Sequence, residues 1–271
     1  MPKYHHNTES WTDDLLSMGR YSFALEELRK AFPEQTETAI KFALKRLASK
    51  NKIVSIFKGY YVIIPPQYSS RGMLPPELFL DVFMKHLQRS YYLALLNAAA
   101  YHGASHQQPQ EYFVMTSFPV MRPTRKKNLK INYISIKDLP DKLTEQHKTE
   151  AGYICISNPV LTAADLLQFE KRIGGISRAA TVLNELAESI KPEDFNTELL
   201  NHSAVTALQR LGYILEFVCR QNTLADALFR ALALQQAKLF RIPLKKSITA
   251  KGFSSDNRWK VIVNTTVETD D

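Results

Sequence analysis

The sequence is poor in cysteine and lacks a long apolar run. It has two cysteines in 271 residues, and Cys155 and Cys219 each lie in an apolar stretch, so we expect small buried side chains and no disulfide framework. The longest apolar run, residues 91–101, falls well short of the ~20 residues that a membrane-spanning helix needs. No charged, apolar and small-residue signal sequence begins the chain. These absences predict a soluble protein of the reducing cytoplasm.

Groups that would hold a nucleotide or a metal ion are also sparse. The chain has 9 glycines and no phosphate-binding loop of the Walker or dinucleotide type. The pair Gly174-Gly175 lies in a helical region, where its usual role is a corner. His102 and His106 have the spacing of two ligands on one helix face, but Gly103 interrupts that helix and no cysteine or carboxylate cluster is near enough to complete a site. We therefore predict no metal and no cofactor.

A magnesium-dependent nuclease is the enzymatic alternative. Such chemistry needs convergent carboxylates with a lysine nearby. Glu111, before one predicted strand, and Lys137-Asp138, after the next, could converge. However, no Asp followed at short spacing by Glu-x-Lys lies within a strand, and a solvated charge at the start of a strand is ordinary. No serine nucleophile elbow and no cysteine beside a histidine base stand out either. We predict that the chain is not an enzyme.

What the chain has in excess is positive charge. It carries 35 Lys and Arg against 27 Asp and Glu, which gives a net charge of +8 and a pI of 9.3. This balance is expected of a protein that visits an anionic polymer, although basicity alone specifies neither fold nor sequence preference. The length favours two domains, because a domain usually has about 100–200 residues.

Residues 36–64 predict a basic helix followed by a β-hairpin. One helix face is apolar because residues recur at i, i+3, i+4 and i+7, namely Ile40, Ala43, Leu44 and Leu47. Thr36 is the expected N-cap and Asn51 the expected stop. Residues 53–57 and 60–64 are rich in β-branched and aromatic side chains and flank the turn Lys58-Gly59. The opposite helix face carries Thr38, Lys41 and Lys45.

The residues before this helix complete the plan of a winged helix-turn-helix. Residues 11–18 predict a first helix that ends near Gly19, and residues 23–32 predict a second that Pro33 stops. Most such domains bind DNA, although some bind only protein, and lysines on a helix face are often merely solvated. A lone domain of this kind would contact a few phosphates through its lysines, namely Lys41, Lys45, Lys50, Lys52 and Lys58.

The predicted fold class is α+β, with a winged helix-turn-helix joined to a larger mixed α/β domain. Residues 65–72 and the following Pro75-Pro76 have the composition of a linker, so we predict domains at 1–66 and 77–271 with a linker at 67–76. In the second domain we expect strands at 111–116, 130–136 and 152–156, and a basic loop at 121–127. Helices are expected at 77–87, 91–101, 160–169, 177–189, 195–200, 205–218 and 223–237. Residues 240–244 and 259–263 should form a hairpin or loop that returns to the sheet.

Four segments after the linker carry a family resemblance. They are YYLALLNAAAYHGASHQQPQEYFVMTS, SNPVLTAADLLQFEKRIGGISRAATVLNELAE, ALQRLGYILEF and the closing LFRIPLKK…RWKVIVN. Together with the basic helix and hairpin, their order over residues 8–264 resembles the AbiEi family of antitoxins from abortive-infection type IV toxin–antitoxin systems. Each motif is loose, and the order over the full length gives the resemblance its specificity.

The resemblance implies an antitoxin that is also a transcriptional autorepressor. In the family, the winged helix binds inverted repeats in the promoter, and the C-terminal domain counteracts a nucleotidyltransferase toxin without forming a stable complex with it. Carried over to this chain, Thr36, Thr38, Lys41 and Lys45 face the major groove and Lys58 reaches phosphate. Basic residues further along the chain would add a positive surface on the C-terminal domain, although lysine-rich loops more often only keep a protein soluble. These basic residues are Arg122, Arg125, Lys126, Lys127, Lys245, Lys246 and Lys251. An adaptor that binds protein and ignores DNA is the other alternative.

Overall fold

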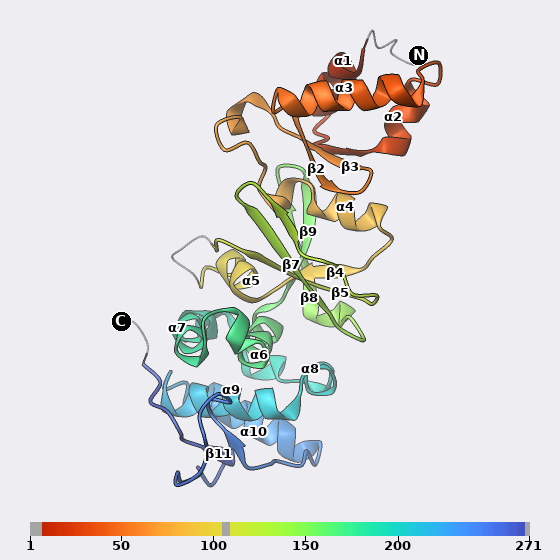
Figure 1. Ribbon diagram of the computed structural model, residues 1–271. Coiled ribbons are helices and arrows are strands. Elements are labelled where there is room, and N and C mark those ends of the chain that lie inside the picture. Colours follow the sequence, from red (N-terminus) through yellow and green to blue (C-terminus); the bar gives the residue numbers. More distant parts are fainter. Residues whose placement is uncertain (1–6, 105–108, 269–271) are drawn as a thin grey trace. The chain divides into compact units, whose positions relative to one another are not determined.

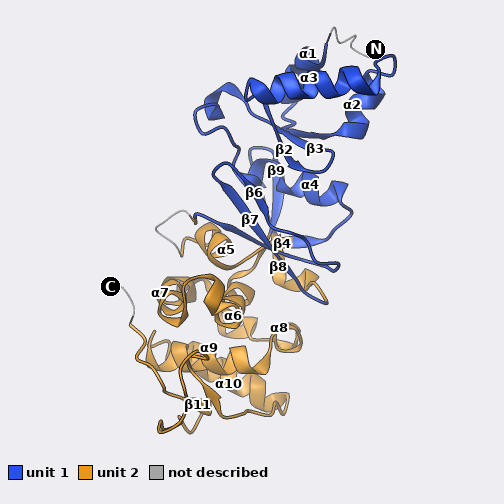
Figure 2. Ribbon diagram, in the orientation of Figure 1, with its two compact units in different colours: residues 1–91, 110–137, 146–155 blue, residues 92–109, 138–145, 156–271 orange. Residues whose placement is uncertain are grey.

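The computed structural model describes residues 7–104 and 109–268. Contacts between Cα atoms divide the chain into two compact units (Figure 2). Unit 1 comprises residues 1–91, 110–137 and 146–155, and unit 2 comprises residues 92–109, 138–145 and 156–271. The α+β class is confirmed: helices and a small antiparallel sheet come first, and a larger mixed sheet with further helices follows (Figure 1). The domain ranges 1–66 and 77–271 stay a prediction.

Three helices and a three-stranded antiparallel sheet form the first part of unit 1. In chain order they are α1 Thr8–Ser17, β1 Ser22–Ala24, α2 Leu25–Ala31, α3 Glu37–Ser49, β2 Ile53–Phe57 and β3 Tyr60–Ile63. Thr36 is the N-cap of α3, as predicted, because its Oγ1 accepts from the Ala39 N–H at 3.2 Å. Asn51, with φ 56°, follows the end of α3, and Gly59, with φ 74°, forms the hairpin turn.

The predicted second helix is shorter than expected at its start. Residues 22–24 pair antiparallel with β3, so that the sheet has the order β1-β3-β2. Helix α2 begins only at Leu25, where the Glu27 carboxylate accepts from the Ala24 N–H at 3.0 Å. The core between the helices and the sheet contains Trp11 and Phe23, whose ring centroids lie 5.0 Å apart in an edge-on arrangement, together with Leu28 and Leu47.

The rest of unit 1 consists of one helix and strands of a larger sheet. Its complete elements are α4 Leu80–His86, β5 Tyr112–Thr116, β6 Thr124–Lys126 and β7 Leu129–Ser135, with single 3-10 turns at Pro66–Tyr68 and Pro76–Leu78, and residues 146–155 add parts of two further strands. β5 pairs parallel with β7, and β6 pairs antiparallel with β7, so part of the predicted basic loop is a strand. Phe83 of α4 packs on the Tyr60 ring of β3 at a centroid distance of 5.0 Å. The segments on either side of residues 67–76 therefore share a core in this unit.

Three strands complete the larger sheet, which has the order β6-β7-β5-β4-β9-β8. They are β4 Tyr91–Leu93, β8 Thr144–Thr149 and β9 Gly152–Ser157. The prediction of a helix over residues 91–101 was wrong at its start, because residues 91–93 form β4 and the helix begins at Leu95. Strand β8, with the sequence TEQHKT, was not predicted, since the four residues between its two threonines are polar or charged and none of its residues is aromatic, Val or Ile.

Helices make up most of unit 2. They are α5 Leu95–Tyr101, α6 Pro159–Gln168, α7 Ile176–Leu186, α8 Thr197–His202, α9 Val205–Phe217 and α10 Asn222–Leu234, with 3-10 turns at Asp141–Leu143, Glu170–Arg172, Ala187–Ser189 and Pro192–Asp194. Gly174 and Gly175, with φ 102° and 106°, turn the chain into α7, as predicted for a corner. The expected return of the tail to the main sheet was wrong: β10 Ile242–Pro243 and β11 Val261–Ile262 pair parallel in a sheet of their own.

Two further predictions concern cysteines and membrane spans. Cys155 and Cys219 are both free thiols; Cys219 is buried, which raises the pKa of its thiol to about 12, whereas Cys155 is half-buried. Within the described residues, the helices are too short or too polar to cross a bilayer.

Candidate functional site

The exposed face of α3 holds the first group of predicted site residues. Ile40, Leu44 and Leu47 point into the core, whereas Thr38, Lys41 and Lys45 are exposed on the other side. Two exposed residues on this helix were not predicted: Arg46 in the last turn, and Phe42, whose exposed fraction is 67%. The 3.6-residue periodicity that separated the two faces could have identified both.

The basic side chains of this face are not neutralised by carboxylates of the described chain. Among the described residues, Lys41, Lys45 and Arg46 make no ion pair. Glu37, at the start of α3, instead pairs with Arg29 at 2.7 Å, and that bond, helped by the Lys41 charge, lowers the pKa of the Glu37 carboxyl. The positive charges at the centre of α3 are therefore available to an external anion.

Lys50 and Lys52 are engaged within the unit. Both contact Glu9 of α1, with Nζ–Oε distances of 3.2 Å for Lys50 and 2.7 Å for Lys52. The bonds from Lys52 and then Lys50 lower the pKa of the Glu9 carboxyl. Any phosphate contact by these two lysines would have to compete with Glu9, so they are weaker candidates than Lys41 and Lys45.

Thr36 and Lys58 lie at the two ends of the α3–hairpin segment. The Thr36 hydroxyl is already the acceptor of the α3 N-cap bond, which leaves its hydrogen to donate elsewhere. Lys58 is exposed at the β2–β3 turn, whose backbone is held by a bond from the Leu25 N–H to the Gly59 carbonyl oxygen at 2.8 Å. The turn is therefore anchored while the lysine beside it stays in solvent.

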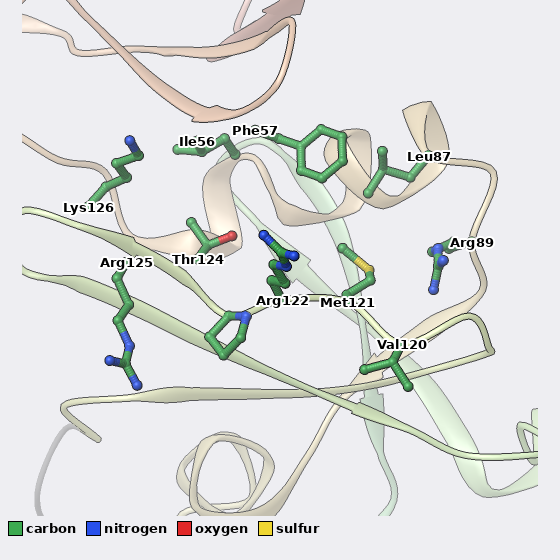
Figure 3. Close-up of a pocket in the computed structure, with 11 residues that line it drawn as sticks. Ile56, Phe57, Leu87, Arg89, Val120, Met121, Arg122, Thr124, Arg125 and Lys126 are labelled. Carbon is green, nitrogen blue, oxygen red and sulfur yellow. The ribbon is translucent and has the colours of Figure 1, made fainter.

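The basic segment 122–127 lies in unit 1, together with α3. The Lys127 Nζ donates to the Asn51 Oδ1 just after α3, at 2.9 Å. Residues of this segment and of β2 line a cavity of about 670 Å³. Figure 3 shows its lining: Ile56 and Phe57 of β2, Leu87 and Arg89 after α4, and residues 120–126.

Within this cavity the cations differ in their surroundings. Arg89 is held by the carbonyl oxygens of Ser117 and Pro119, at 2.8 and 2.6 Å. The Arg122 side chain extends into the middle of the cavity, and Arg125 points away from it (Figure 3). Neither of these two, nor Lys126, forms an ion pair within the described part of the chain. Sequence reasoning could not place this segment beside β2, because the contact depends on the pairing of β6 with β7.

The three remaining lysines of the predicted positive surface lie in unit 2. Lys245 is fixed through its backbone, which exchanges hydrogen bonds with the Asn264 side chain at 3.0 and 2.9 Å. The pKa of Lys246 is lowered, first by partial burial and then by Arg210 and Lys171 nearby. Lys251 is exposed. These lysines therefore belong to a different unit from residues 122–127.

The residues considered for catalysis have structural partners. Glu111 pairs with Lys130 and accepts from Asn132 at 2.8 Å, and the bond from Lys130 lowers the pKa of the Glu111 carboxyl. The His102 Nε2 donates to the Ser157 carbonyl oxygen at 2.8 Å, and His106 lies outside the described residues. In the described chain, no three His, Cys, Asp or Glu side chains form a group that could hold a metal ion.

The chain is similar in sequence to a protein family and in fold to a solved structure. Residues 92–217 match a family model described as the AbiEi antitoxin C-terminal domain. The crystal structure of the RV2827C protein from Mycobacterium tuberculosis is similar, with a TM-score of 0.68 and 16% sequence identity over 92% of this chain and 88% of that chain. At this identity the likeness concerns the fold alone. A search of curated proteins gives no match. Over residues 92–217, the family match confirms the resemblance drawn from the sequence motifs.

Proposed function

Because residues 92–217 match the family model of the AbiEi antitoxin C-terminal domain, we propose that this protein is an antitoxin that also represses its own promoter. Unit 1 binds double-stranded promoter DNA at inverted repeats through α3 and the β2–β3 hairpin. The C-terminal part counteracts a cognate nucleotidyltransferase toxin and forms no stable complex with it. The protein is not itself an enzyme.

The observation that carries the DNA-binding proposal is the exposed face of α3. The element order α1-β1-α2-α3-β2-β3 is that of a winged helix-turn-helix. In such a domain the helix before the hairpin enters the major groove, which is wide enough to admit it. On α3 this face presents Lys41, Lys45 and Arg46, which make no ion pair among the described residues. Lys58 at the hairpin turn supplies a further phosphate contact.

A second group of cations supports the same proposal. Arg122, Arg125 and Lys126 belong to the same unit as α3 and also make no ion pair within the described residues. Arginine and lysine side chains of this kind position a protein on DNA through phosphates, without reading its sequence. The proposal therefore assigns sequence reading to α3 and additional electrostatic affinity to residues 122–126.

Salt dependence provides the first test. Fluorescence anisotropy of the full-length protein with duplexes from the region upstream of its gene should give a slope of log affinity on log salt of roughly −3 to −5, at about −0.9 for each neutralised phosphate. The double change Lys41→Glu with Lys45→Glu should abolish binding at moderate salt. It should leave the fold intact, because both side chains are exposed.

A matched control tests whether the change in net charge alone accounts for the loss of DNA binding. Lys171→Glu with Lys191→Glu makes the same change in charge on exposed residues of unit 2, and it should bind DNA almost as the wild type does. A flat salt response of the wild-type protein would contradict DNA binding and favour a protein adaptor. Equal losses in both double variants would show that only net charge matters.

Protection against the toxin tests the other half of the proposal. With the toxin expressed from a separate promoter, the Lys41→Glu, Lys45→Glu protein should still restore growth, because the family-matched residues lie outside α3. Its folding should be verified by a cooperative melt. A folded variant that no longer protects cells would show that antitoxicity needs the DNA-binding face, and the division of labour proposed here would be wrong.

A further inference from the structure

Phe42 is an apolar ring on the most exposed side of a basic helix. Its exposed fraction is 67%, although it lies at the centre of α3. With about 100° of rotation per residue, Phe42 lies roughly 200° around the helix from Ile40, whose side chain is buried in the core. The ring therefore projects from the side of α3 opposite to the core.

The neighbours of this ring are polar and positively charged. Thr38 precedes Phe42 by four residues, and Lys45 and Arg46 follow it by three and four, so all three lie beside the ring on the helix surface. Lys41 is the adjacent residue. All four side chains are exposed.

This setting indicates what would cover the ring. A protein partner that buried Phe42 in an apolar pocket would also bring Lys41, Lys45 and Arg46 out of water, which is costly without matching carboxylates. The major groove of DNA offers both chemistries at once: phosphates along its edges and, on thymine, a C5 methyl group on its floor. A cation-flanked aromatic ring fits that combination.

We propose that Phe42 contacts the C5 methyl group of thymine in the major groove and thereby contributes to sequence preference. This inference rests on the proposed DNA-binding function of α3. Lys41 and Lys45 neutralise the flanking phosphates, and the ring excludes water from the methyl group. Thymine presents a methyl group there and cytosine does not, so the contact selects for thymine at one or two positions.

Deoxyuridine substitution tests the contact, because deoxyuridine differs from thymidine by that methyl group alone. The probe is the duplex that the full-length wild-type protein selects from a random pool, with each thymine replaced in turn by deoxyuridine. Loss of one contacted methyl group should weaken wild-type binding about fourfold, from about 0.8 kcal/mol per buried methylene-sized group. Phe42→Ala should bind the thymine duplex more weakly and bind both duplexes equally.

Two variants serve as controls. Phe42→Leu keeps an apolar side chain and should keep part of the thymine preference. Met18→Ala removes an exposed apolar side chain, 64% exposed, that follows α1, and it should discriminate as the wild type does.

The outcomes separate this inference from the function on which it rests. Wild-type binding that is indifferent to every deoxyuridine, or a Phe42→Ala variant that keeps the full preference for thymine, overturns the role of Phe42 while DNA binding stands. A selection that yields no duplex, or salt-independent binding, overturns the proposed DNA binding and this inference with it.

Discussion

Asp165 should make the stability of unit 2 depend on pH. This aspartate of α6 is 4% exposed, and its Oδ2 accepts a hydrogen bond from the Tyr92 hydroxyl at 3.0 Å. Burial raises the pKa of the carboxyl to about 7 from an ordinary value of 3.8, and the bond from Tyr92 offsets only part of that effect. Asp165 is therefore expected to hold its proton over much of the mildly acidic range.

The sign of the effect follows from proton binding. Between about pH 4 and pH 7 the folded protein retains the Asp165 proton and the unfolded chain has released it, so the free energy of unfolding falls as pH rises. A shift of about three pKa units, at about 1.4 kcal/mol each, corresponds to a loss on the order of 4 kcal/mol across that window. Above pH 7 the contribution no longer changes. Asp165→Asn removes the titration and keeps an oxygen that can accept from Tyr92.

The two tryptophans of the chain allow unit 2 to be observed separately. Trp11 lies in unit 1, so a Trp11→Phe background leaves Trp259, fully buried in unit 2, as the fluorescent reporter. Urea unfolding of this protein, with and without Asp165→Asn, should be measured from pH 4.5 to 8. The free energy of unfolding of the asparagine variant, relative to that of the protein with Asp165, should increase by a few kcal/mol up to about pH 7 and then level off.

The deciding quantity is the difference in the free energy of unfolding between the Trp11→Phe protein and its Asp165→Asn variant at each pH. Other carboxylates titrate in both proteins and cancel. A difference that stays constant from pH 4.5 to 8 would show that Asp165 does not titrate in this range. A difference that moves in favour of aspartate as pH rises would mean that its pKa is lowered in the fold, contrary to the argument from burial.

Two packing predictions follow in the same unit. Gly212→Ala should destabilise unit 2 by about 1–3 kcal/mol in urea unfolding, because the added Cβ would lie 2.1 Å from the Trp259 ring; an unchanged midpoint would mean that the ring moves freely. Glu170→Gln should cost about 3–5 kcal/mol, because Arg210 is buried and Glu170, at 3.7 Å, is its ion-pair partner, while the terminal nitrogens of Arg210 have no hydrogen-bond partner among the described residues. The pair change Arg210→Met with Glu170→Met should be closer to wild type, and a larger loss in the pair than in Glu170→Gln would contradict this reasoning.

Elements with a local signal could be predicted from the sequence. The α3 helix, its Thr36 cap and the Gly59 turn follow from periodicity, capping chemistry and turn geometry within a few residues of each other. Strand β1 could not be predicted in this way, because Ser22–Ala24 is a strand only through pairing with β3, almost forty residues later. Residues 91–93 open an apolar run that continues as a helix, and they become β4 for the same reason, through pairing in the larger sheet.

In the candidate site, too, only the features that depend on local sequence could be predicted. Lys41 and Lys45 could be placed on one face of a helix because their positions depend on the helix alone. The competition of Glu9 for Lys50 and Lys52 depends on how α1 packs near the end of α3, which no local pattern specifies. The position of residues 122–127 beside β2 depends in turn on the larger sheet.

The first two of the four motifs contact each other in unit 2. Tyr92, from the first motif, donates to Asp165 of the second. His102, also from the first motif, donates to the carbonyl oxygen of Ser157, which opens the second. Each side chain is specified by a partner that lies more than fifty residues away.

The last two motifs meet around Trp259. Gly212 of α9 leaves room for the indole ring, and the Glu216 carboxylate, one turn later, accepts from the indole Nε1 at 2.7 Å and from Arg258 at 3.1 Å. Asn264 then holds the preceding loop by donating to the Ile248 carbonyl oxygen at 2.9 Å. Changing these motif residues should destabilise unit 2, so a loss of the proposed antitoxin activity in such variants would not identify the surface responsible for it. Residues with that role are better sought among exposed side chains, where a substitution can abolish protection while Trp259 still reports a folded unit.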